Sequence, residues 1–408
     1  MNILFLTMSR ISGLTTRGIY IDLVRKFRDE GHEVYIITPH ERSVGLPTEL
    51  KEVDSIHILG VKTLNLQKTN VIEKGLGQIL VESQYKSAIK QYLNEIKFDL
   101  ILYSTPPVTF PKAIAFLKKN NPQAKTYLLL KDIFPQNAVD IGMMSTAGVK
   151  GLLYKFFRNK EKKLYAASDY IGCMSPANVE YVLKHNPEIH SDRVEVAPNS
   201  IELTNRINND EGQIKAERYY IRSKYNLPTD RPIFIYGGNL GRPQGIPFLI
   251  QCLDANSNRT DCHFVIIGNG TERKKLVEWA ESRQPLSVTI MDKLPKEDYD
   301  QLAASCDVGL IFLDHRFTIP NYPSRLLPYL ENKMPIIAAT DSNCDTGKIA
   351  EENGYGYWCE SNSVEAFTAI VDKMIASNRK DMGEKGYKFL CENYLVQNTY
   401  DAIIKHFK

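Results

Sequence analysis

Residues 1–38 read MNILFLTMSRISGLTTRGIYIDLVRKFRDEGHEVYIIT, and this stretch decides the fold class. It opens with a continuous apolar run, Met1–Met8, which predicts a buried strand. A helical pattern follows over residues 16–30, with apolar side chains at Ile19, Leu23, Val24 and Phe27. Gly31 is a residue type that commonly ends a helix, and the apolar residues after it predict a second strand. Because parallel strands buried on both faces read as apolar runs, this opening predicts an α/β fold.

The alternation of strands and helices continues in two series. In the first series, further strands are expected at 55–59, 99–104, 125–130, 169–174 and 193–198. The second series is expected at 232–238, 262–268, 287–292, 308–313, 334–340 and 355–360. Two such series predict two doubly wound, mostly parallel sheets with helices on both faces.

A polar and charged stretch, 202–227, separates the two series and places the domain junction. We therefore expect an N-terminal Rossmann-like domain over 1–205 and a C-terminal one over 206–385. Residues 386–408 are expected to form helices that return to the N-terminal domain. With two such domains, the cleft between them is the expected active site.

The composition is that of an ordinary globular protein and excludes several classes. Of the 408 residues, 43% are hydrophobic and 24% charged, which does not fit a disordered or collagen-like chain. A net charge of +3 argues against a dedicated nucleic-acid-binding protein. The seven cysteines show neither C-x-x-C pairs nor zinc spacing, so we expect reduced thiols in the cytoplasm. No apolar stretch reaches about 18 residues, so no transmembrane helix is expected.

A glycine-rich loop, GGNLGRPQG at 237–245, comes directly after an expected strand. Glycines let the backbone approach an anion, and the helix expected near Pro247 offers free N–H groups to it. The sequence therefore predicts a diphosphate site at Gly238, Asn239 and Gly241, with Arg242 as a bidentate partner. An ordinary tight turn between strand and helix explains the glycines equally well.

Three further elements of the second series predict contacts to the same ligand. Gly268 and Asn269 lie in a similar loop, and Lys293 lies in a loop that suits a nucleobase edge. Ser324 is expected to cap a helix, which places Arg325 in its first turn. Because a cation there is unfavourable with respect to the helix dipole, a bound anion accounts for it best. Turn formation and a surface arginine are the structural alternatives.

The motifs G-G-N-x-G (237–241), I-I-G-x-G (266–270) and P-S-R-L-x-x-Y-L-x-x-x-x-P-I-I (323–337), in this order, resemble the retaining glycosyltransferases of the GT-B fold. They are most similar to the family 4 branch that builds the repeat units of bacterial capsules and O-antigens. Residues 17–38 resemble that family's first βαβ unit, so the resemblance covers nearly the whole chain.

The resemblance implies two Rossmann-like domains facing across a cleft and a transfer of hexosyl or N-acetylhexosaminyl groups with retention of configuration. It further implies a UDP-sugar donor and an undecaprenyl-diphosphate-linked saccharide acceptor at the cytoplasmic face of the inner membrane. No D-x-D motif lies at a strand end, so no metal or other cofactor is expected. No nucleic-acid partner is expected either.

The chain departs from the family pattern at several functional positions. Many members carry two glutamates eight residues apart, which would fall on Pro320 and Pro328. The family's phosphate-binding Arg and Lys would fall on Asn239 and Gln244. These departures leave Arg242 and Arg325 as the expected cations for the diphosphate.

The acceptor side is predicted around KDIFPQ, residues 131–136. This segment resembles an Asp-x-aromatic-Pro-acid pattern of the family, with Gln136 in place of the acid. Asp132 follows a strand and is expected to orient or deprotonate an acceptor hydroxyl, unless it merely caps the turn. Acceptor-side candidates from the first loop are Ser9, Gly13 and Arg17, which loop formation explains equally well.

Residues 150–163, KGLLYKFFRNKEKK, combine basic residues with apolar ones at helical spacing. Such helices often lie on anionic membrane surfaces, and the family resemblance implies that this one makes peripheral contact with the inner membrane. The alternative is a helix whose apolar face packs on the sheet while its lysines meet solvent. Three rivals to the transferase are a GT-B sugar-nucleotide epimerase, a nicotinamide oxidoreductase and a non-catalytic binder of sugar nucleotides or protein.

Overall fold

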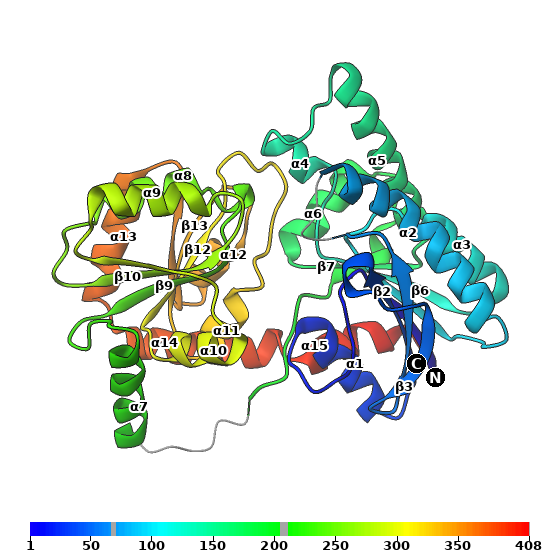
Figure 1. The fold of residues 1–408 in the computed structure, drawn as a ribbon, viewed down its shortest axis with the longest axis horizontal. Helices are drawn as coiled ribbons and strands as arrows, with labels where there is room; N and C mark the ends of the chain where they lie inside the picture. The colour runs from blue at the N-terminus through cyan, green and yellow to red at the C-terminus, as the bar shows by residue number, and fades with distance from the viewer. Residues whose placement is uncertain (67–70, 205–210, 408) are drawn as a thin grey trace. The chain divides into compact units, whose positions relative to one another are not determined.

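The computed structural model describes residues 1–66, 71–204 and 211–407, which form two compact units (Figure 1). Unit 1 comprises Met1–Glu202 together with Val396–Lys408, and unit 2 comprises Leu203–Leu395. The domain boundary expected between 205 and 206 lies outside the described residues, as does residue 408. Among the described residues, no helix combines the length and apolar character needed to cross a bilayer.

Unit 1 is built on a sheet of order β3-β4-β2-β1-β5-β6-β7-β8, parallel except for β3. Its strands are β1 (Asn2–Leu6), β2 (Glu33–Glu41), β3 (Glu49–Val53), β4 (Ile56–Thr63), β5 (Leu100–Ser104), β6 (Lys125–Leu130), β7 (Tyr170–Cys173) and β8 (Val194–Val196). Its helices are α1 (Ile19–Asp29), α2 (Val71–Tyr92), α3 (Pro111–Asn120), α4 (Gln136–Asp140), α5 (Gly148–Ala166), α6 (Pro176–His185) and α15 (Val396–Ile404). The first helix begins three residues later than its pattern predicted, at Ile19.

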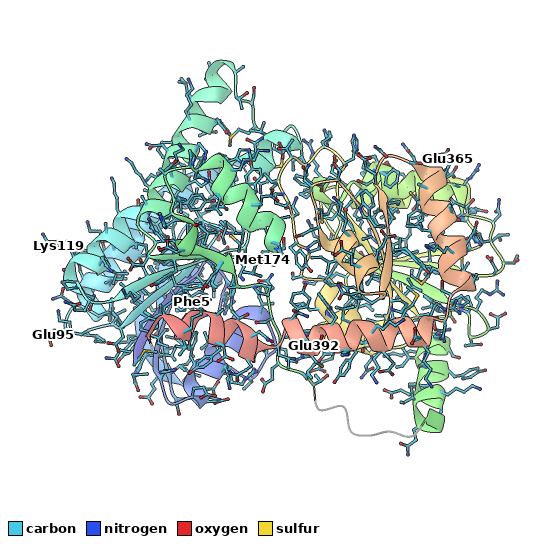
Figure 2. The ribbon with its side chains drawn as sticks, turned by 180° about the vertical axis from the view of Figure 1, so that it is seen from behind. Phe5, Glu95, Lys119, Met174, Glu365 and Glu392 are labelled. Carbon is cyan, nitrogen blue, oxygen red and sulfur yellow. The ribbon has the colours of Figure 1, made fainter. Side chains whose placement is uncertain are left out.

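The core of unit 1 forms where β1 lies between β2 and β5. Phe5 is opposite Ile36 on one neighbour and Leu102 on the other, and all three side chains are buried in one cluster. Helices α1 and α15 pack together and cover this face of the sheet. Charged side chains such as Glu95 and Lys119 point outward instead (Figure 2). Burial of apolar strands on both faces confirms the α/β class predicted from residues 1–38.

The antiparallel strand β3 was not predicted. It forms a hairpin with β4, and the two turn residues, Asp54 and Ser55, both have positive φ angles of 51° and 59°. Such a turn usually carries Asn-Gly or Asp-Gly, so Asp-Ser gave no hairpin signal. The exposed, charged residues of β3 also lack the apolar run that marks a buried strand.

Unit 2 is built on a parallel sheet of order β11-β10-β9-β12-β13-β14. Its strands are β9 (Ile233–Asn239), β10 (His263–Asn269), β11 (Val288–Met291), β12 (Val308–Phe312), β13 (Ile336–Thr340) and β14 (Gly356–Glu360). Its helices are α7 (Glu211–Lys224), α8 (Ile246–Ala255), α9 (Arg273–Arg283), α10 (Lys296–Ala304), α11 (Leu326–Glu331), α12 (Thr346–Glu352), α13 (Val364–Ala376) and α14 (Arg379–Asn393).

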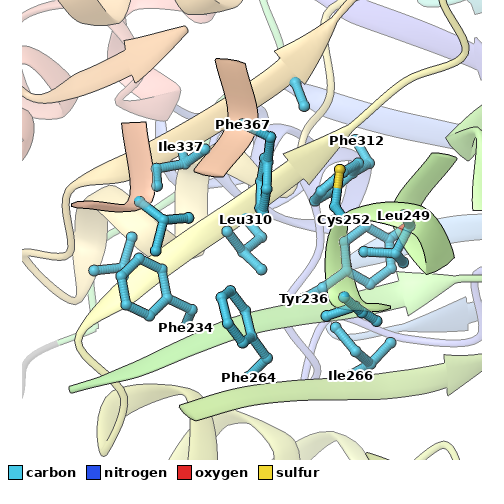
Figure 3. Close-up of a cluster of buried hydrophobic side chains, with 14 of the residues drawn as sticks. Phe234, Tyr236, Leu249, Cys252, Phe264, Ile266, Leu310, Phe312, Ile337 and Phe367 are labelled. Atoms are coloured by element: carbon cyan, nitrogen blue, oxygen red, sulfur yellow. The ribbon is translucent and has the colours of Figure 1, made fainter. Parts of the chain in front are cut away.

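The core of unit 2 is rich in aromatic side chains (Figure 3). Phe234 and Phe264 pair across β9 and β10 with ring centroids 5.3 Å apart, and Phe312 meets Phe367 of α13 at the same distance. Helices α8, α9 and α13 lie on one face of the sheet, and α10, α11 and α14 on the other (Figure 1). The second predicted sheet is thereby confirmed.

The strand order of each sheet identifies where ligands bind. In unit 1 the order reverses between β1 and β5, and in unit 2 between β9 and β12. In doubly wound sheets, ligands bind beyond the carboxyl ends of the strands at such a switch point. The loops after β1, β5 and β6, and those after β9, β10 and β12, are therefore the places to search for a site.

Candidate active site

The glycine loop of unit 2 lies at its switch point. Strands β9 and β10 end side by side, with Gly238 opposite Gly268 and Asn239 opposite Asn269. A Cβ atom built on Gly268 would lie 1.9 Å from the carbonyl oxygen of Gly238, so no larger residue fits. Gly238 itself has a φ angle of 129°, which L side chains rarely adopt. The structure thus brings four of the predicted donor-site residues to one edge of the sheet.

Two neutral side chains occupy the positions where the family resemblance implies cations. Asn239 Nδ2 donates to Gln244 Oε1 over 2.9 Å, and the Gly241 N–H donates to the same oxygen over 3.2 Å. A Cβ atom on Gly241 would come within 2.8 Å of Asn239 Nδ2. Asn239 and Gln244 therefore brace the loop and add no positive charge to it.

The positive charge at this edge comes from Arg325. Its guanidinium carbon lies 4.1 Å from the ring centroid of Tyr236, on β9. A Cβ atom on Gly238 would lie 3.4 Å from Arg325 Nη2, so the guanidinium is directly against the glycine loop. Arg325 Nη1 is buried and has no hydrogen-bond partner among the residues that the structure describes. Burial of a charged donor without a partner is costly, and a bound anion would remove that cost.

Tyr236 holds this arrangement in place. Its hydroxyl donates to the carbonyl oxygen of Asn239 over 2.8 Å, which ties the ring to the glycine loop. Burial raises the pKa of Tyr236, while the nearby Arg325 guanidinium opposes that rise. Tyr236 was not among the predicted site residues, because an aromatic residue inside an apolar strand carries no signal that separates it from the core.

The start of α11 differs from the prediction. Its N-cap residue is Arg325, without a side-chain cap, and Ser324 is exposed. The expectation that Ser324 caps the helix is therefore wrong: it is the Ser324 carbonyl that accepts, from the Leu327 N–H over 3.1 Å. Pro328, at the position of the second expected family glutamate, is the third residue of this helix.

The other two predicted cations lie further out. The Arg242 side chain is 56% exposed, and its Nε lies 3.8 Å from Oε1 of the buried Glu272. Lys293 is exposed in the loop after β11, the edge strand of the sheet. Arg325 is therefore the predicted cation that lies directly against Gly238, whereas the Arg242 side chain points out from the loop to which it belongs and Lys293 lies in a different loop.

The corresponding edge of unit 1 carries Asp132, just after β6. Its Oδ1 accepts a hydrogen bond of 2.7 Å from Asn137 Nδ2, and its backbone N–H donates to Thr105 Oγ1 over 3.2 Å. Burial raises the pKa of Asp132 to about 6, although the bond from Asn137 opposes the rise. Burial likewise raises the pKa of Tyr20, at the start of α1, and the charge of Asp132 adds to that rise. Asp132 and Tyr20 thus lie close enough to interact.

The residues predicted from the first loop of unit 1 have structural contacts. Ser9 donates its backbone N–H to Thr7 Oγ1 over 3.0 Å, and a Cβ atom on Gly13 would lie 3.1 Å from Asp54 Oδ2. Arg17 Nη2 donates to the carbonyl oxygen of Glu202.

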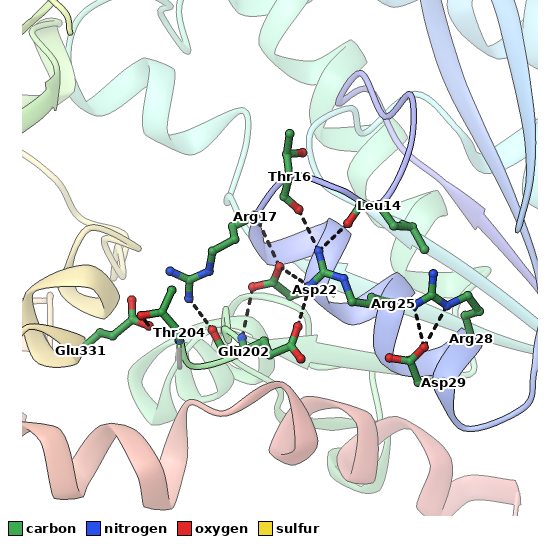
Figure 4. A network of polar contacts seen from close by, with 11 residues as sticks. Leu14, Thr16, Arg17, Asp22, Arg25, Arg28, Asp29, Glu202, Thr204 and Glu331 are labelled. Carbon is green, nitrogen blue, oxygen red and sulfur yellow. Dashed lines mark hydrogen bonds and ion pairs between the residues drawn. The ribbon is translucent and has the colours of Figure 1, made fainter. Parts of the chain in front are cut away.

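Arg17 belongs to a network of polar contacts that joins the loop after β1 to Glu202, the last residue of the segment Met1–Glu202 (Figure 4). In the same network, Arg25 pairs with Asp22 over 3.2 Å and Glu202 over 2.5 Å, and it donates to the carbonyl oxygens of Leu14 and Thr16.

Two family models match the chain, one over most of each unit. The model described as Glycosyltransferase Family 4 matches residues 19–205, and that described as Glycosyl transferases group 1 matches residues 218–389. Over 340 residues the chain is 23% identical to the probable glycosyltransferase WbjE of Pseudomonas aeruginosa, covering 80% of this chain and 78% of WbjE.

A second relative and a solved structure agree with these matches. The putative colanic acid biosynthesis glycosyl transferase WcaI of Escherichia coli is 26% identical over 155 residues, 37% of each chain. The structure of Anabaena HepE in complex with UDP is 13% identical with a TM-score of 0.67, covering 100% of this chain and 99% of HepE. Because family models match both halves of the chain and its two sheets are those of GT-B structures, the protein belongs to the retaining family 4 glycosyltransferases, which use nucleotide sugars as donors.

Proposed function

We propose that this protein transfers a hexosyl or N-acetylhexosaminyl group from a UDP-sugar to a lipid-linked saccharide. The product would be a repeat unit of a bacterial capsular polysaccharide or O-antigen. The observation that carries the proposal is the Arg325 guanidinium, which lies against Gly238 with a buried, unpartnered Nη1. Such a group suits the diphosphate of a nucleotide sugar, since arginine binds phosphate oxygens in pairs.

The remaining donor contacts follow from the edge of the unit 2 sheet. Gly238, Gly241 and Gly268 let the backbone N–H groups approach the phosphates. The exposed side chains of Asn239 and Asn269 are assigned to polar groups of the donor. Further donor contacts are assigned to Arg242, Lys293 and Ser324, all exposed around this edge.

The nature of the donor and product is supported by two of the related proteins. HepE, which shares the fold, is described in complex with UDP. WcaI is described as a putative colanic acid biosynthesis glycosyl transferase, and colanic acid is a polysaccharide. For this chain, UDP and a polysaccharide repeat unit are the simplest extension of those descriptions.

In the reaction, the bond between the sugar anomeric carbon and the diphosphate breaks and the acceptor oxygen bonds to that carbon. Negative charge develops on the leaving diphosphate, where Arg325 and the backbone N–H groups stabilise it. Asp132 orients the acceptor hydroxyl, and the proton of that hydroxyl passes to the leaving diphosphate. Ser9, Gly13 and Arg17 are assigned to the acceptor side as part of the loop after β1.

A lipid-linked acceptor agrees with the surface of α5. Its apolar side chains Val149, Leu152, Leu153 and Phe156 are exposed at helical spacing, with Val149 85% and Leu152 67% exposed. Exposed lysines lie along the same helix, at 155, 162 and 163. A helix that presents apolar and basic side chains to solvent suits the surface of an anionic membrane. Peripheral contact with the inner membrane through residues 150–163 is therefore part of the proposal.

Not every residue of this segment is available for that contact. Arg158 pairs with the buried Glu161 over 2.6 Å, and it also donates to Asn186 Oδ1 over 2.7 Å. Its charge is therefore used within unit 1. The side chain of Lys150 lies outside the described residues.

The proposal is tested by thermal denaturation with UDP-, GDP- and dTDP-sugars. A ligand present at 100 times its Kd stabilises a protein by about 2.7 kcal/mol, which gives a clear shift of the melting temperature. We expect stabilisation by UDP-sugars alone. If none of the nucleotide sugars stabilises the protein, the proposed donor site is wrong. If the protein converts a UDP-sugar to its epimer without any acceptor, the proposed transferase activity is wrong and the protein is an epimerase.

A further inference from the structure

The segment from the end of β6 to the first turn of α4 contains a hydrogen-bonded pair of side chains, Asp132 and Asn137, of which the proposed function uses only Asp132. Asn137 Nδ2 donates to Asp132 Oδ1 over 2.7 Å. The backbone holds the pair together, because the Asn137 N–H donates to the carbonyl oxygen of Ile133 over 3.1 Å. Asp132 is therefore oriented by a residue five positions further along the same short connection.

Asn137 also has an amide oxygen without a partner. Its Oδ1 is buried and accepts no hydrogen bond from residues 1–66, 71–204 or 211–407. The neighbouring Gln136 differs, since its Nε2 donates to Asp140 Oδ1 over 2.7 Å and its Oε1 accepts from the Tyr154 hydroxyl over 3.2 Å. Most buried polar atoms in native proteins have a partner, so this acceptor, at a sheet's ligand-binding edge, can take its donor from a bound ligand or an ordered water.

The carboxylate of Asp132 is not used in an ion pair, as far as the described residues go. Two other aspartates of unit 1 do form ion pairs. Asp169 pairs with Lys118 over 2.8 Å, and Asp22 pairs with Arg25 over 3.2 Å. Asp132 instead lies at the ends of β5 and β6, bonded to Asn137 and Thr105 and near Tyr20. A carboxylate kept free of cations at this edge is available to a hydroxyl group.

We propose that Asn137 positions Asp132 and that the two side chains bind a pair of neighbouring hydroxyl groups on the acceptor sugar. The inference rests on the proposed function and names the class of acceptor: a saccharide whose reacting hydroxyl has a free hydroxyl on the adjacent carbon. The Nδ2 that holds Asp132 and the unpartnered Oδ1 belong to the same amide group of Asn137, so the carboxylate and this oxygen are parts of one bonded pair of side chains. Oδ1 and an ionised carboxylate both accept and do not donate, so the pair suits two O–H donors.

The test compares acceptors that differ by one hydroxyl. Transfer from a UDP-sugar is measured with a panel of octyl glycosides and with derivatives that lack the hydroxyl next to the reacting one. For the wild-type protein, loss of this hydroxyl should lower kcat/KM roughly 10- to 100-fold, as expected when one buried hydrogen bond is lost. Asn137→Ala should be slower by a similar factor on the parent glycoside and should lose no further activity on the deoxy derivative.

Two further variants separate positioning from folding. Asn137→Asp keeps the size of the side chain but replaces the donor to Asp132 with a second carboxylate, so kcat should fall while UDP still stabilises the protein. Asn94→Ala, which changes an exposed asparagine of unit 1, should behave as the wild type.

Three outcomes would overturn the inference. The first is an Asn137→Ala variant whose kcat/KM on the parent glycoside equals that of the wild type. The second is an Asn137→Ala variant whose kcat/KM falls on the deoxy derivative by the same factor as that of the wild type. The third is a wild-type protein that binds UDP yet transfers to none of the glycosides. That third result would reject the acceptor assignment and leave the donor site intact, whereas failure of UDP to stabilise the protein would reject the proposed function itself.

Discussion

Replacing Arg325 with methionine should weaken donor binding without weakening the fold. The substitution removes the guanidinium but keeps an unbranched side chain of apolar character against Tyr236. The lost cation–π contact, 4.1 Å from guanidinium carbon to ring centroid, is worth about 0.5–2 kcal/mol. Removing the buried, unpartnered Nη1 ends a desolvation cost of about 1–3 kcal/mol and so stabilises the folded protein by that amount. The free energy of unfolding without ligand should therefore change by about −1 to +2.5 kcal/mol, which is a small gain at the middle of the two ranges.

Donor binding should change in the opposite direction. A hydrogen bond between a charged group and phosphate contributes about 1.5–3 kcal/mol, so the Kd for UDP should rise roughly 10- to 100-fold. Urea denaturation with and without UDP measures both quantities on one sample. Arg283→Met, which removes a half-exposed arginine paired with Asp254 on the surface, is the matched control and should leave the Kd unchanged. A variant that loses more than about 2 kcal/mol of stability but binds UDP normally would show that Arg325 is a structural residue.

Three further changes test other parts of the structure. Because burial raises the pKa of Asp132 from 3.8 to about 6, its proton stabilises the fold at low pH, and this contribution is lost as pH rises through 6. The free energy of unfolding of Asp132→Asn, measured by urea denaturation, should therefore rise relative to that of the wild type between pH 4 and pH 7, by at most about 3 kcal/mol; an unchanged difference between the two proteins over this range would contradict this. Gly237→Ala places a Cβ atom 2.1 Å from the Tyr299 hydroxyl oxygen and 2.3 Å from a carbon of its ring, and should lower the free energy of unfolding by about 1–3 kcal/mol; this loss should shrink in a Tyr299→Ala background, which removes the ring. Replacing the exposed Leu152 and Phe156 with serine should reduce co-sedimentation with anionic liposomes while UDP binding is unchanged, and undiminished binding would exclude α5 as the membrane contact.

The sequence predicted the sheets well because their strands are buried on both faces. A parallel strand such as β9 needs apolar residues throughout, and that requirement is visible in a single sequence. The antiparallel β3 obeys a different rule, since its charged residues face solvent and its turn uses Asp54 and Ser55 in left-handed conformations. Its formation depends on pairing with β4, which local residue patterns do not encode.

In the candidate site, too, some residues could be predicted from the sequence and others could not. Gly238 and Gly268 were predictable because only glycine allows the close approach of the two strand ends. The contact of Arg325 with Tyr236 joins residues far apart in the chain, so the sequence indicated a cation but not the aromatic ring that holds it. Asn137 was missed because an asparagine near a helix start normally reads as turn chemistry. Its importance comes from an orphaned oxygen, which only the packed structure displays.

The last helix of the chain, α15, has a practical consequence. Its side chains Val396, Tyr400 and Ile403 pack into the same cluster as Phe27, and the Val396 N–H donates to the carbonyl oxygen of Ile201 over 2.9 Å. Unit 1 is therefore discontinuous in sequence, with unit 2 inserted between its pieces. A fragment that ends at residue 202 lacks α15, so the apolar surface of α1 that this helix covers would be exposed to solvent. Such a fragment should aggregate when expressed alone. Supplying residues 396–408 through a short engineered linker is the rational way to obtain that half as a separate, folded reagent.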